Sequence, residues 1–379
     1  MDNKYVAYYA NEERLIPAQV HVDDLTKLYA SRHALFMQMG LAPGLLAGKS
    51  ILEIGPAQGE HARFILEQKP ASYTFIEGNP QCMPALKAVA QAYSEHTRCD
   101  IHETLFETHQ LKQQYDVVWC ERTIECQQDP KGFLQEVLPL VAHGGVLLVT
   151  SIDTLSSLPD FLRYFAAKRL VNEQMSYAAQ CQRLCPLFTP HLQTLKGMKK
   201  PAMNWVEENL LFPLKDKKFV SQGDILSVVE GAFQVTGTAP NSLNDWRWYQ
   251  EVLDQPGQAN ARTAQNLLEQ AHNLLDYRSQ YSAAEVESVR ALYQQSQTII
   301  QWIEQHDRRR DQSAVEGVVA ALETMIDFYD NWPGPTADSL RDYCRILPTL
   351  SAETKVLDMG GFTSMFGRGV QHMLLARVV

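Results

Sequence analysis

The sequence has few basic residues and no long apolar runs. These two features count against a nucleic-acid-binding protein and against a membrane-spanning protein. Its 379 residues include 34 Lys and Arg against 44 Asp and Glu, a net charge of −10. A basic face for phosphate contacts is therefore not expected, so nucleic acid is a poor candidate partner. No apolar run approaches the roughly 20 residues that cross a bilayer. The opening residues, Met-Asp-Asn-Lys-Tyr, also lack the apolar core of a signal peptide.

Cysteine is present, but not in the spacings that bind metals or build a disulfide framework. The seven cysteines are scattered, their number is odd, and no Cys-x-x-Cys pair exists. Cys181 and Cys185 stand at helical spacing without a matching His or Cys pair nearby, so we predict no metal site. Reduced thiols favour a cytoplasmic protein. The length suggests about two to three domains, or one core with large insertions.

The stretch Ser50-Ile-Leu-Glu-Ile-Gly-Pro-Ala-Gln-Gly59 organises the chain. Residues 51–54 form an apolar run typical of a buried strand, and residues 60–67 follow a helical pattern. Between them, Gly55, Ala57 and Gly59 form a turn of small residues, which lets a ligand approach the backbone closely. The spacing is Gly-x-Ala-x-Gly rather than the Gly-x-Gly-x-x-Gly that places a pyrophosphate at a helix N-terminus. The stretch therefore predicts half of a nucleotide-binding unit.

Further strands alternate with helical patterns after this turn. We expect strands at residues 51–54, 72–77, near 98–100, at 115–120, 146–150 and 233–238, and a last one within 367–378. This order predicts an α/β protein with an open parallel sheet and helices on both faces. Ligands of such sheets sit beyond the carboxyl ends of the strands.

Acidic residues gather at that predicted edge. Glu77 ends the second strand, and its two oxygens suit the two hydroxyl groups of a ribose. Asp100 ends the third expected strand and is a candidate acceptor for an adenine amino group, with His102 and Glu103 as alternatives. Glu121 follows the fourth strand and Asp153 follows the fifth. These acidic residues and the glycine turn are all predicted at the same edge of the sheet, and this is the strongest sequence argument for a cofactor site.

The rest of the chain divides into segments around this core. We predict an N-terminal helical cap (1–45), a nucleotide-binding core (46–152), a substrate-side insertion (153–220), and a core helix, sixth strand and aromatic segment (221–252). A helical insertion (253–345), serving as a lid or dimer surface, and a C-terminal return strand (346–379) complete the chain. No fixed-period repeat is present.

The core resembles the class I S-adenosylmethionine (SAM)-dependent methyltransferases, whose motif I the turn and the preceding Glu53 match. The whole chain is also similar to a bacterial subfamily of these enzymes found near surface-polysaccharide genes. The motifs ILEIGPAQGEH, IEGNP, CERTIECQQDP, GGVLLVTSIDTLS, DWRWYQ and GRGVQHM carry that similarity. The resemblance implies a Rossmann-like seven-stranded methyltransferase sheet whose last strand is antiparallel, with helical insertions. It also implies SAM as cofactor.

The resemblance and the residue chemistry together predict the residues of the site. The predicted cofactor-binding residues are Glu53, Gly55, Ala57, Gly59, Glu77, Asp100 and Glu121. The predicted catalytic residues are Glu121, Glu125, Asp153 and His191, because a methyl transfer to oxygen usually needs a base. Trp205, Trp246 and Lys196 come from the insertions and are the predicted substrate-binding residues.

The favoured function is therefore methyl transfer from SAM to an O or N atom of a small polar or glycan-type acceptor. One alternative is a SAM-binding regulatory or scaffold protein without transfer activity. Another is an NAD-linked oxidoreductase, which the Gly-x-Ala-x-Gly spacing disfavours. A homodimer through the helical insertion is a further expectation.

Overall fold

The computed structural model describes residues 25–109, 111–172, 174–198, 200–211, 218–243, 245–309 and 313–378. The chain divides into two compact units, each built from separate stretches. The first comprises Met1–Ile152, Asp216–Leu267 and Val370–Val379, and the second comprises Asp153–Lys215 and Leu268–Gly369. Of the predicted cap, residues 1–24 lie outside the described residues.

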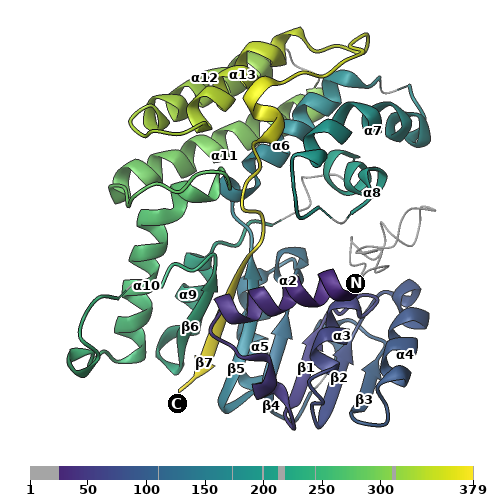
Figure 1. Cartoon of the computed structure of the whole chain (residues 1–379), viewed down its shortest axis with the longest axis vertical. Helices are drawn as coiled ribbons and strands as arrows, with labels where there is room; N and C mark the ends of the chain where they lie inside the picture. The colour runs from purple at the N-terminus through teal and green to yellow at the C-terminus, as the bar shows by residue number, and fades with distance from the viewer. Residues whose placement is uncertain are drawn as a thin grey trace. The chain divides into compact units, whose positions relative to one another are not determined.

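The first unit is built on one seven-stranded sheet (Figure 1). Its strands are β1 (Ser50–Ile54), β2 (Ser72–Ile76), β3 (Arg98–His102), β4 (Tyr115–Cys120), β5 (Val141–Ser151), β6 (Phe233–Ala239) and β7 (Gln371–Arg377). They lie in the order β3-β2-β1-β4-β5-β7-β6. β1 to β5 pair in parallel, whereas β7 is antiparallel to both β5 and β6. The predicted fold class is confirmed, including the antiparallel return of the last strand.

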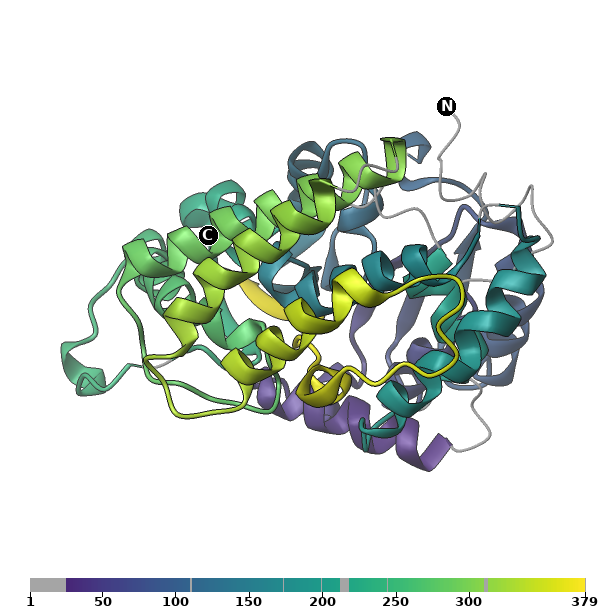
Figure 2. The ribbon, with the colours of Figure 1, turned by 90° about the horizontal axis from the view of Figure 1, so that it is seen from above.

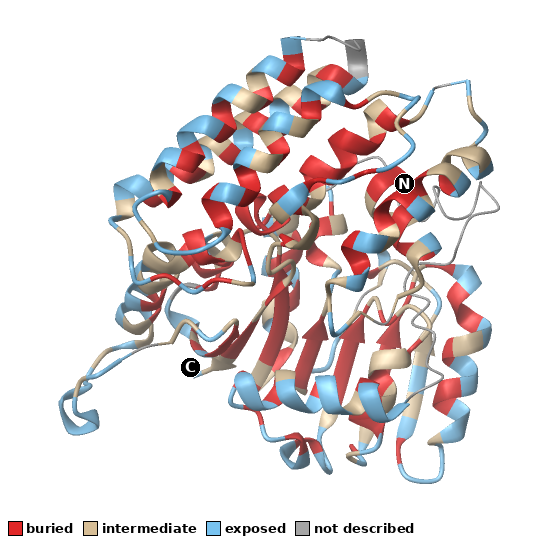
Figure 3. Cartoon of the chain, turned by 45° about the horizontal axis from the view of Figure 1, so that its top comes forward, coloured by how far each residue is buried: buried red, intermediate tan, exposed pale blue. Residues whose placement is uncertain are grey.

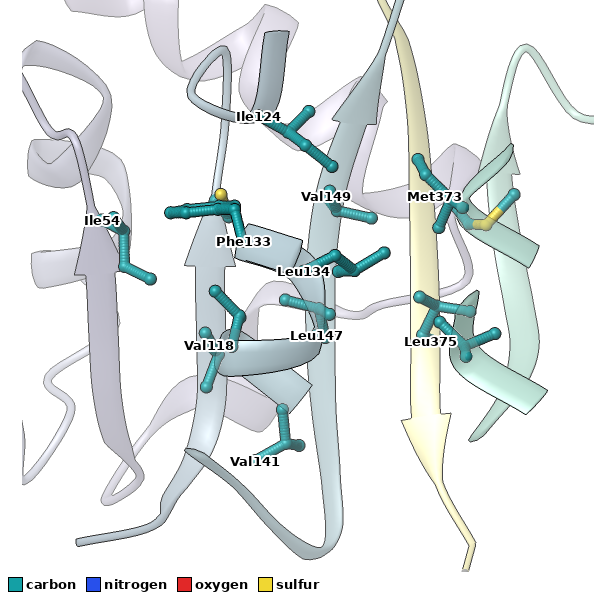
Figure 4. Packing of buried hydrophobic residues seen from close by; sticks show 14 of the residues in the cluster. Ile54, Val118, Ile124, Phe133, Leu134, Val141, Leu147, Val149, Met373 and Leu375 are labelled. Atoms are coloured by element: carbon teal, nitrogen blue, oxygen red, sulfur yellow. The ribbon is translucent and has the colours of Figure 1, made fainter. Parts of the chain in front are cut away.

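The strands read as apolar runs because both faces of the sheet are covered. Leu52 and Val118 belong to one buried cluster, while their neighbours Ile51 and Val117 belong to another. Figure 4 shows the first cluster, where Phe133 and Leu134 of α5 pack over the middle strands. In Figure 3 these strands are coloured as buried along most of their length. The helices assigned to this unit are α2 (Leu25–Gln38), α3 (Glu60–Leu66), α4 (Met83–Ala92), α5 (Pro130–Val137), α9 (Gln222–Val229) and most of α10 (Pro256–Gln270).

The second unit is helical. It contains α6 (Thr154–Leu170), α7 (Tyr177–Gln193), α8 (Ala202–Val206) with a π-helical turn at Glu207–Leu211, α11 (Val286–Arg309), α12 (Ser313–Tyr329) and α13 (Thr336–Ile346). α11 packs against α6 and α12, and α12 packs against α13 (Figure 2). Residues 346–369, which the sequence analysis grouped with the return strand, also lie in this unit. In the described part of the chain, no helix combines the length and apolarity needed to cross a membrane.

Gly237 of β6 lets α2 end close against the sheet. A Cβ atom built on Gly237 would lie 1.8 Å from the carbonyl oxygen of Met39, which follows α2. Backbone atoms cannot move aside as a flexible side chain does. Since α2 carries Arg32, this close approach positions a residue of the site described below.

We therefore expect Gly237→Ala to destabilise the protein by about 3 kcal/mol, because it overpacks a backbone contact. Urea unfolding followed by circular dichroism measures the change. Gly223→Ala is the matched control, since the nearest atom to its added Cβ is Ser221 Oγ at 3.6 Å. Equal midpoints for the two variants would contradict the close packing of α2.

Candidate functional site

The turn after β1 adopts the backbone that its small residues permit. Gly55, Ala57 and Gly59 have φ values of 75°, 49° and 80°, in the left-handed region that favours glycine. A side chain on Gly55 would also meet Thr123 Oγ1 at 2.6 Å. The turn is therefore a backbone feature held close to the loop after β4.

Glu77 joins this turn to the end of β2. Its Oε2 accepts the Ala57 amide proton at 2.8 Å, and its Oε1 accepts the Asn79 amide proton at 2.7 Å. Burial raises the pKa of Glu77, although the amide groups of Asn79 and Ala57 oppose that rise. Each carboxylate oxygen has a second lone pair, so both can still accept a hydroxyl proton.

Asp100 lies differently from the expectation. β3 continues to His102, so the third strand does not end near Asp100, and this residue stands in mid-strand beside Thr74. The Asp100 side chain is 49% exposed and pairs with Arg98 Nε at 3.3 Å. The sequence placed the strand end two residues early because an exposed edge strand lacks an apolar run. Its contact to adenine stays a prediction.

Glu121, at the end of β4, is the centre of a buried charge cluster. Arg32 Nη1 donates to its Oε1 at 2.9 Å, and His372 Nε2 lies 3.3 Å from the same oxygen. Trp119 Nε1 donates to Oε2 at 3.1 Å, and His61 Nδ1 lies 3.6 Å from it. Burial alone would raise the pKa of Glu121, but Arg32 and the histidines hold it well below its usual range. Glu121 is therefore an anion at neutral pH.

Glu53 of β1 lies beside this cluster, and its pKa is shifted in the opposite direction from that of Glu121. The Tyr73 hydroxyl donates to Glu53 Oε2 at 2.6 Å. Burial, reinforced by the negative charge of Glu121, raises the pKa of Glu53 to about 7, against smaller opposing effects of Tyr73, His61 and Arg32. Near neutral pH this carboxyl group is thus partly protonated.

We expect Glu53→Gln to change how stability depends on pH. Because the folded pKa of about 7 lies above the ordinary glutamate pKa of 4.5, wild-type folding takes up a proton between these values. The stabilisation is full below about pH 4.5 and is lost as pH rises through 7, by up to about 3 kcal/mol. The variant, whose side chain does not titrate, should not lose this amount.

Urea unfolding at pH 5 and pH 7.5 measures the difference. The stability of Glu53→Gln relative to wild type should therefore be higher at pH 7.5 than at pH 5. Glu107→Gln, on an exposed carboxylate in the 3-10 turn Phe106–Thr108 after β3, is the control. Parallel pH profiles for wild type and Glu53→Gln would contradict a raised pKa at Glu53.

Glu125 lies on the same loop as Glu121 but has a different partner. Arg122 Nε donates to its Oε1 at 3.1 Å, and the side chain is buried. Its Oε2 is also buried and has no hydrogen-bond partner among the described residues. Glu125 therefore keeps one acceptor free at the carboxyl edge of β4.

The other two predicted catalytic residues belong to the second unit. Asp153 caps α6: its Oδ1 accepts the Ser156 amide proton at 2.7 Å, and the Tyr293 hydroxyl donates to its Oδ2 at 3.1 Å. His191 in α7 accepts from Arg163 Nε at 3.2 Å and is fully buried. Burial, with the charge of Arg163, lowers the pKa of His191 to about 3. Capping and packing account for the contacts of both residues.

The predicted substrate-binding residues differ widely in exposure. Trp205 of α8 is buried, with its ring centroid 6.3 Å from that of Phe188 in the second unit. Lys196 is exposed in the same unit. Trp246 belongs to the first unit and is 92% exposed. Their role in substrate binding stays a prediction.

Sequence reasoning did not identify Arg32 or His372. A signal for Arg32 exists, since it stands with Leu28 and Phe36 at four-residue spacing on the buried side of α2. A charged residue on an apolar helix face needs a buried partner. His372 carries no comparable signal, because its partner is 251 residues away.

Parts of the chain are similar to known methyltransferases. Residues 27–196 match the family model described as a methyltransferase domain, which is less than half of the chain. Among solved structures, the chain is similar to the N-methyltransferase NodS from Bradyrhizobium japonicum WM9 in complex with S-adenosyl-l-homocysteine. The identity is 16%, the coverage is 40% of this chain and 75% of that one, and the TM-score is 0.32.

Two further structures are similar over shorter parts of their length. The plantazolicin methyltransferase BpumL is 14% identical, with 42% of this chain and 60% of that chain covered and a TM-score of 0.32. The CcbJ methyltransferase from Streptomyces caelestis is 18% identical, with 35% and 50% covered and a TM-score of 0.27. The match therefore spans about half of the CcbJ chain. The match to the methyltransferase-domain model includes β1 to β5 of the first unit and extends into the second unit.

Proposed function

We propose that this protein transfers a methyl group from SAM to an O or N atom of a small polar or glycan-type acceptor. The observation that carries the proposal is the Glu77 carboxylate, which holds the glycine turn and keeps a lone pair on each oxygen for a ribose hydroxyl. The positive φ values of the turn support close backbone approach of the same ligand.

The residues present fit SAM on one further point. The Nε and Nη2 atoms of Arg32 are buried donors without a partner in the described structure. A ligand with ribose hydroxyls at one end and an anionic group at the other suits both the Glu77 acceptors and these donors.

When bound, SAM supplies an electrophilic methyl group on a sulfonium, and the chain supplies alignment and exclusion of water. Glu121 does not suit the role of a base, because its pKa lies well below its usual range and a strong base needs a higher one. We propose instead that its fixed negative charge favours the sulfonium end of the cofactor. Glu125, with a free Oε2, is the proposed proton acceptor for a hydroxyl acceptor.

Incubating the protein with SAM and a panel of amines and glycans, and measuring S-adenosylhomocysteine (SAH) release, tests the activity. We expect acceptor-dependent release that Glu125→Gln lowers by about 100-fold for a hydroxyl acceptor and less for a neutral amine. SAH binding without release on any acceptor would favour the regulatory alternative. Equal turnover by Glu125→Gln and wild type on a hydroxyl acceptor would remove Glu125 as the base.

A further inference from the structure

A loop between β6 and α10 of the first unit exposes a group of large apolar side chains (Figure 1). We call residues 245–254 the aromatic loop. The exposed fractions are 92% for Trp246, 59% for Trp248, 76% for Tyr249 and 82% for Leu253. Elsewhere in the described residues, exposed large apolar side chains occur singly along the sequence. Single apolar side chains on a surface are ordinary, whereas a contiguous group marks an interaction surface.

Ion pairs hold the aromatic loop in one shape. Arg247 Nη2 pairs with Asp245 at the start of the loop at 2.5 Å and with Asp254 at its end at 2.8 Å. Arg262 of α10 pairs with the same oxygen of Asp254 at 2.9 Å. The loop is therefore closed across its base and tied to a helix of its own unit. A loop that is already held in one conformation loses less entropy when a partner covers it.

The composition of the aromatic loop is that of a protein interface. Trp, Tyr and Arg are the residue types that carry most of the binding energy in such interfaces. The two aspartates and two arginines of the ion-pair network balance one another, so Glu251 is the charged residue of the loop outside that network. A loop without excess positive charge does not attract an anionic membrane. Its nearly balanced charge also lets it meet another copy of a chain whose net charge is −10.

The size of the exposed surface favours a second copy of this chain over a different protein. An aromatic side chain offers about 150–250 Å², so the exposed parts of the three rings offer about 350–550 Å². A stable interface takes about 800 Å² from each partner. A different protein that covered the loop once would bury less than this. Two copies related by a two-fold axis each bury their own loop and the surface that receives the partner's loop, which gives about 700–1,100 Å² per chain.

We propose that the aromatic loop is a dimerisation surface on which a second copy of this chain packs through a reciprocal, two-fold contact. Trp246 and Leu253 are its two most exposed apolar side chains and carry the largest share of the contact. This proposal assigns the dimer to the aromatic loop rather than to the helices of residues 253–345 that the sequence analysis expected.

Sedimentation velocity of the full chain over a concentration series tests the proposal. We expect wild type to form dimers at micromolar concentration, and Trp246→Ser/Leu253→Ser to raise the dimer dissociation constant by at least about 100-fold. Arg247→Gln opens the base of the loop but keeps its rings, and should raise the constant by about 10-fold. Val356→Ser, at an exposed apolar side chain of the second unit, is the matched control and should leave the constant unchanged.

Urea unfolding checks that Trp246→Ser/Leu253→Ser is folded, and Trp248→Ser/Tyr249→Ser repeats the test with different side chains. Wild-type protein that stays monomeric throughout the series would overturn the proposal, as would dimers that both double variants leave unchanged. Oligomers that keep growing with concentration would overturn the two-fold contact. Monomeric wild-type protein that sediments with vesicles of phosphatidylcholine and phosphatidylglycerol, and loses this binding in the double variants, would replace the second copy with a membrane surface.

Discussion

Replacing Glu77 with alanine is expected to lower the affinity for SAH by about 100-fold. The change removes the two proposed hydrogen bonds to the ribose, which together contribute at least about 2.7 kcal/mol, the equivalent of 100-fold. It also leaves the amide groups of Ala57 and Asn79 without the oxygens that accept them at 2.8 and 2.7 Å. Glu77→Ala therefore removes hydrogen bonds that hold the turn as well as the proposed hydrogen bonds to the ligand.

Calorimetry with SAH measures this loss, and two variants calibrate it. Glu77→Gln keeps one acceptor oxygen without the charge and should lie between alanine and wild type. Glu287→Ala removes an exposed carboxylate of α11 that pairs with Arg290 and should leave SAH affinity unchanged. If Glu77→Ala binds SAH within threefold of wild type, the ribose assignment is wrong.

The second large effect is expected on stability. Glu121→Gln should lower the free energy of unfolding by about 3 kcal/mol, because it leaves Arg32 as a buried cation without its anion. Urea unfolding at pH 7 measures the loss, and Glu103→Gln, which breaks an exposed ion pair, should cost under about 1 kcal/mol. Removing both charges in Arg32→Gln/Glu121→Gln should cost less than the sum of the single changes.

The pH dependence of Glu121→Gln gives a second readout. The folded pKa of Glu121 lies well below the ordinary glutamate pKa of 4.5. Its stabilisation is therefore present above about pH 4.5 and is lost as pH falls toward the folded pKa. Wild-type protein should lose more stability than Glu121→Gln between pH 5 and pH 3. Equal losses in both proteins, or a cost at pH 7 no larger than that of Glu103→Gln, would contradict the buried ion pair.

The sequence was informative where one local signal decides the structure. Strands buried on both faces give mostly apolar runs, which is why β1 and β4 were predicted and are confirmed. The antiparallel direction of β7, which the resemblance implied, is also confirmed. The turn was recognisable because its backbone requires small residues, and Ala57 shows that alanine satisfies that requirement.

The sequence was less informative where a residue's role depends on distant partners. Asp153 follows β5, but it also begins Asp-Thr-Leu-Ser, a helix-capping pattern, and the structure uses it as a cap. His191 has a position in the sequence that suits a base, yet Arg163 and burial lower its pKa to about 3. Arg32 and His372 meet at Glu121 from opposite ends of the chain. The polysaccharide-related subfamily, the cytoplasmic location and the dimer stay predictions.

Titrating wild-type protein with SAH, and separately with NAD⁺, tests the central claim most directly. The account predicts saturable binding of one SAH per chain with micromolar-range affinity, weakened by Glu77→Ala and unaffected by Glu287→Ala, and no comparable binding of NAD⁺. The absence of SAH binding by folded protein, or tighter binding of NAD⁺ than of SAH, would contradict a SAM site at the turn after β1.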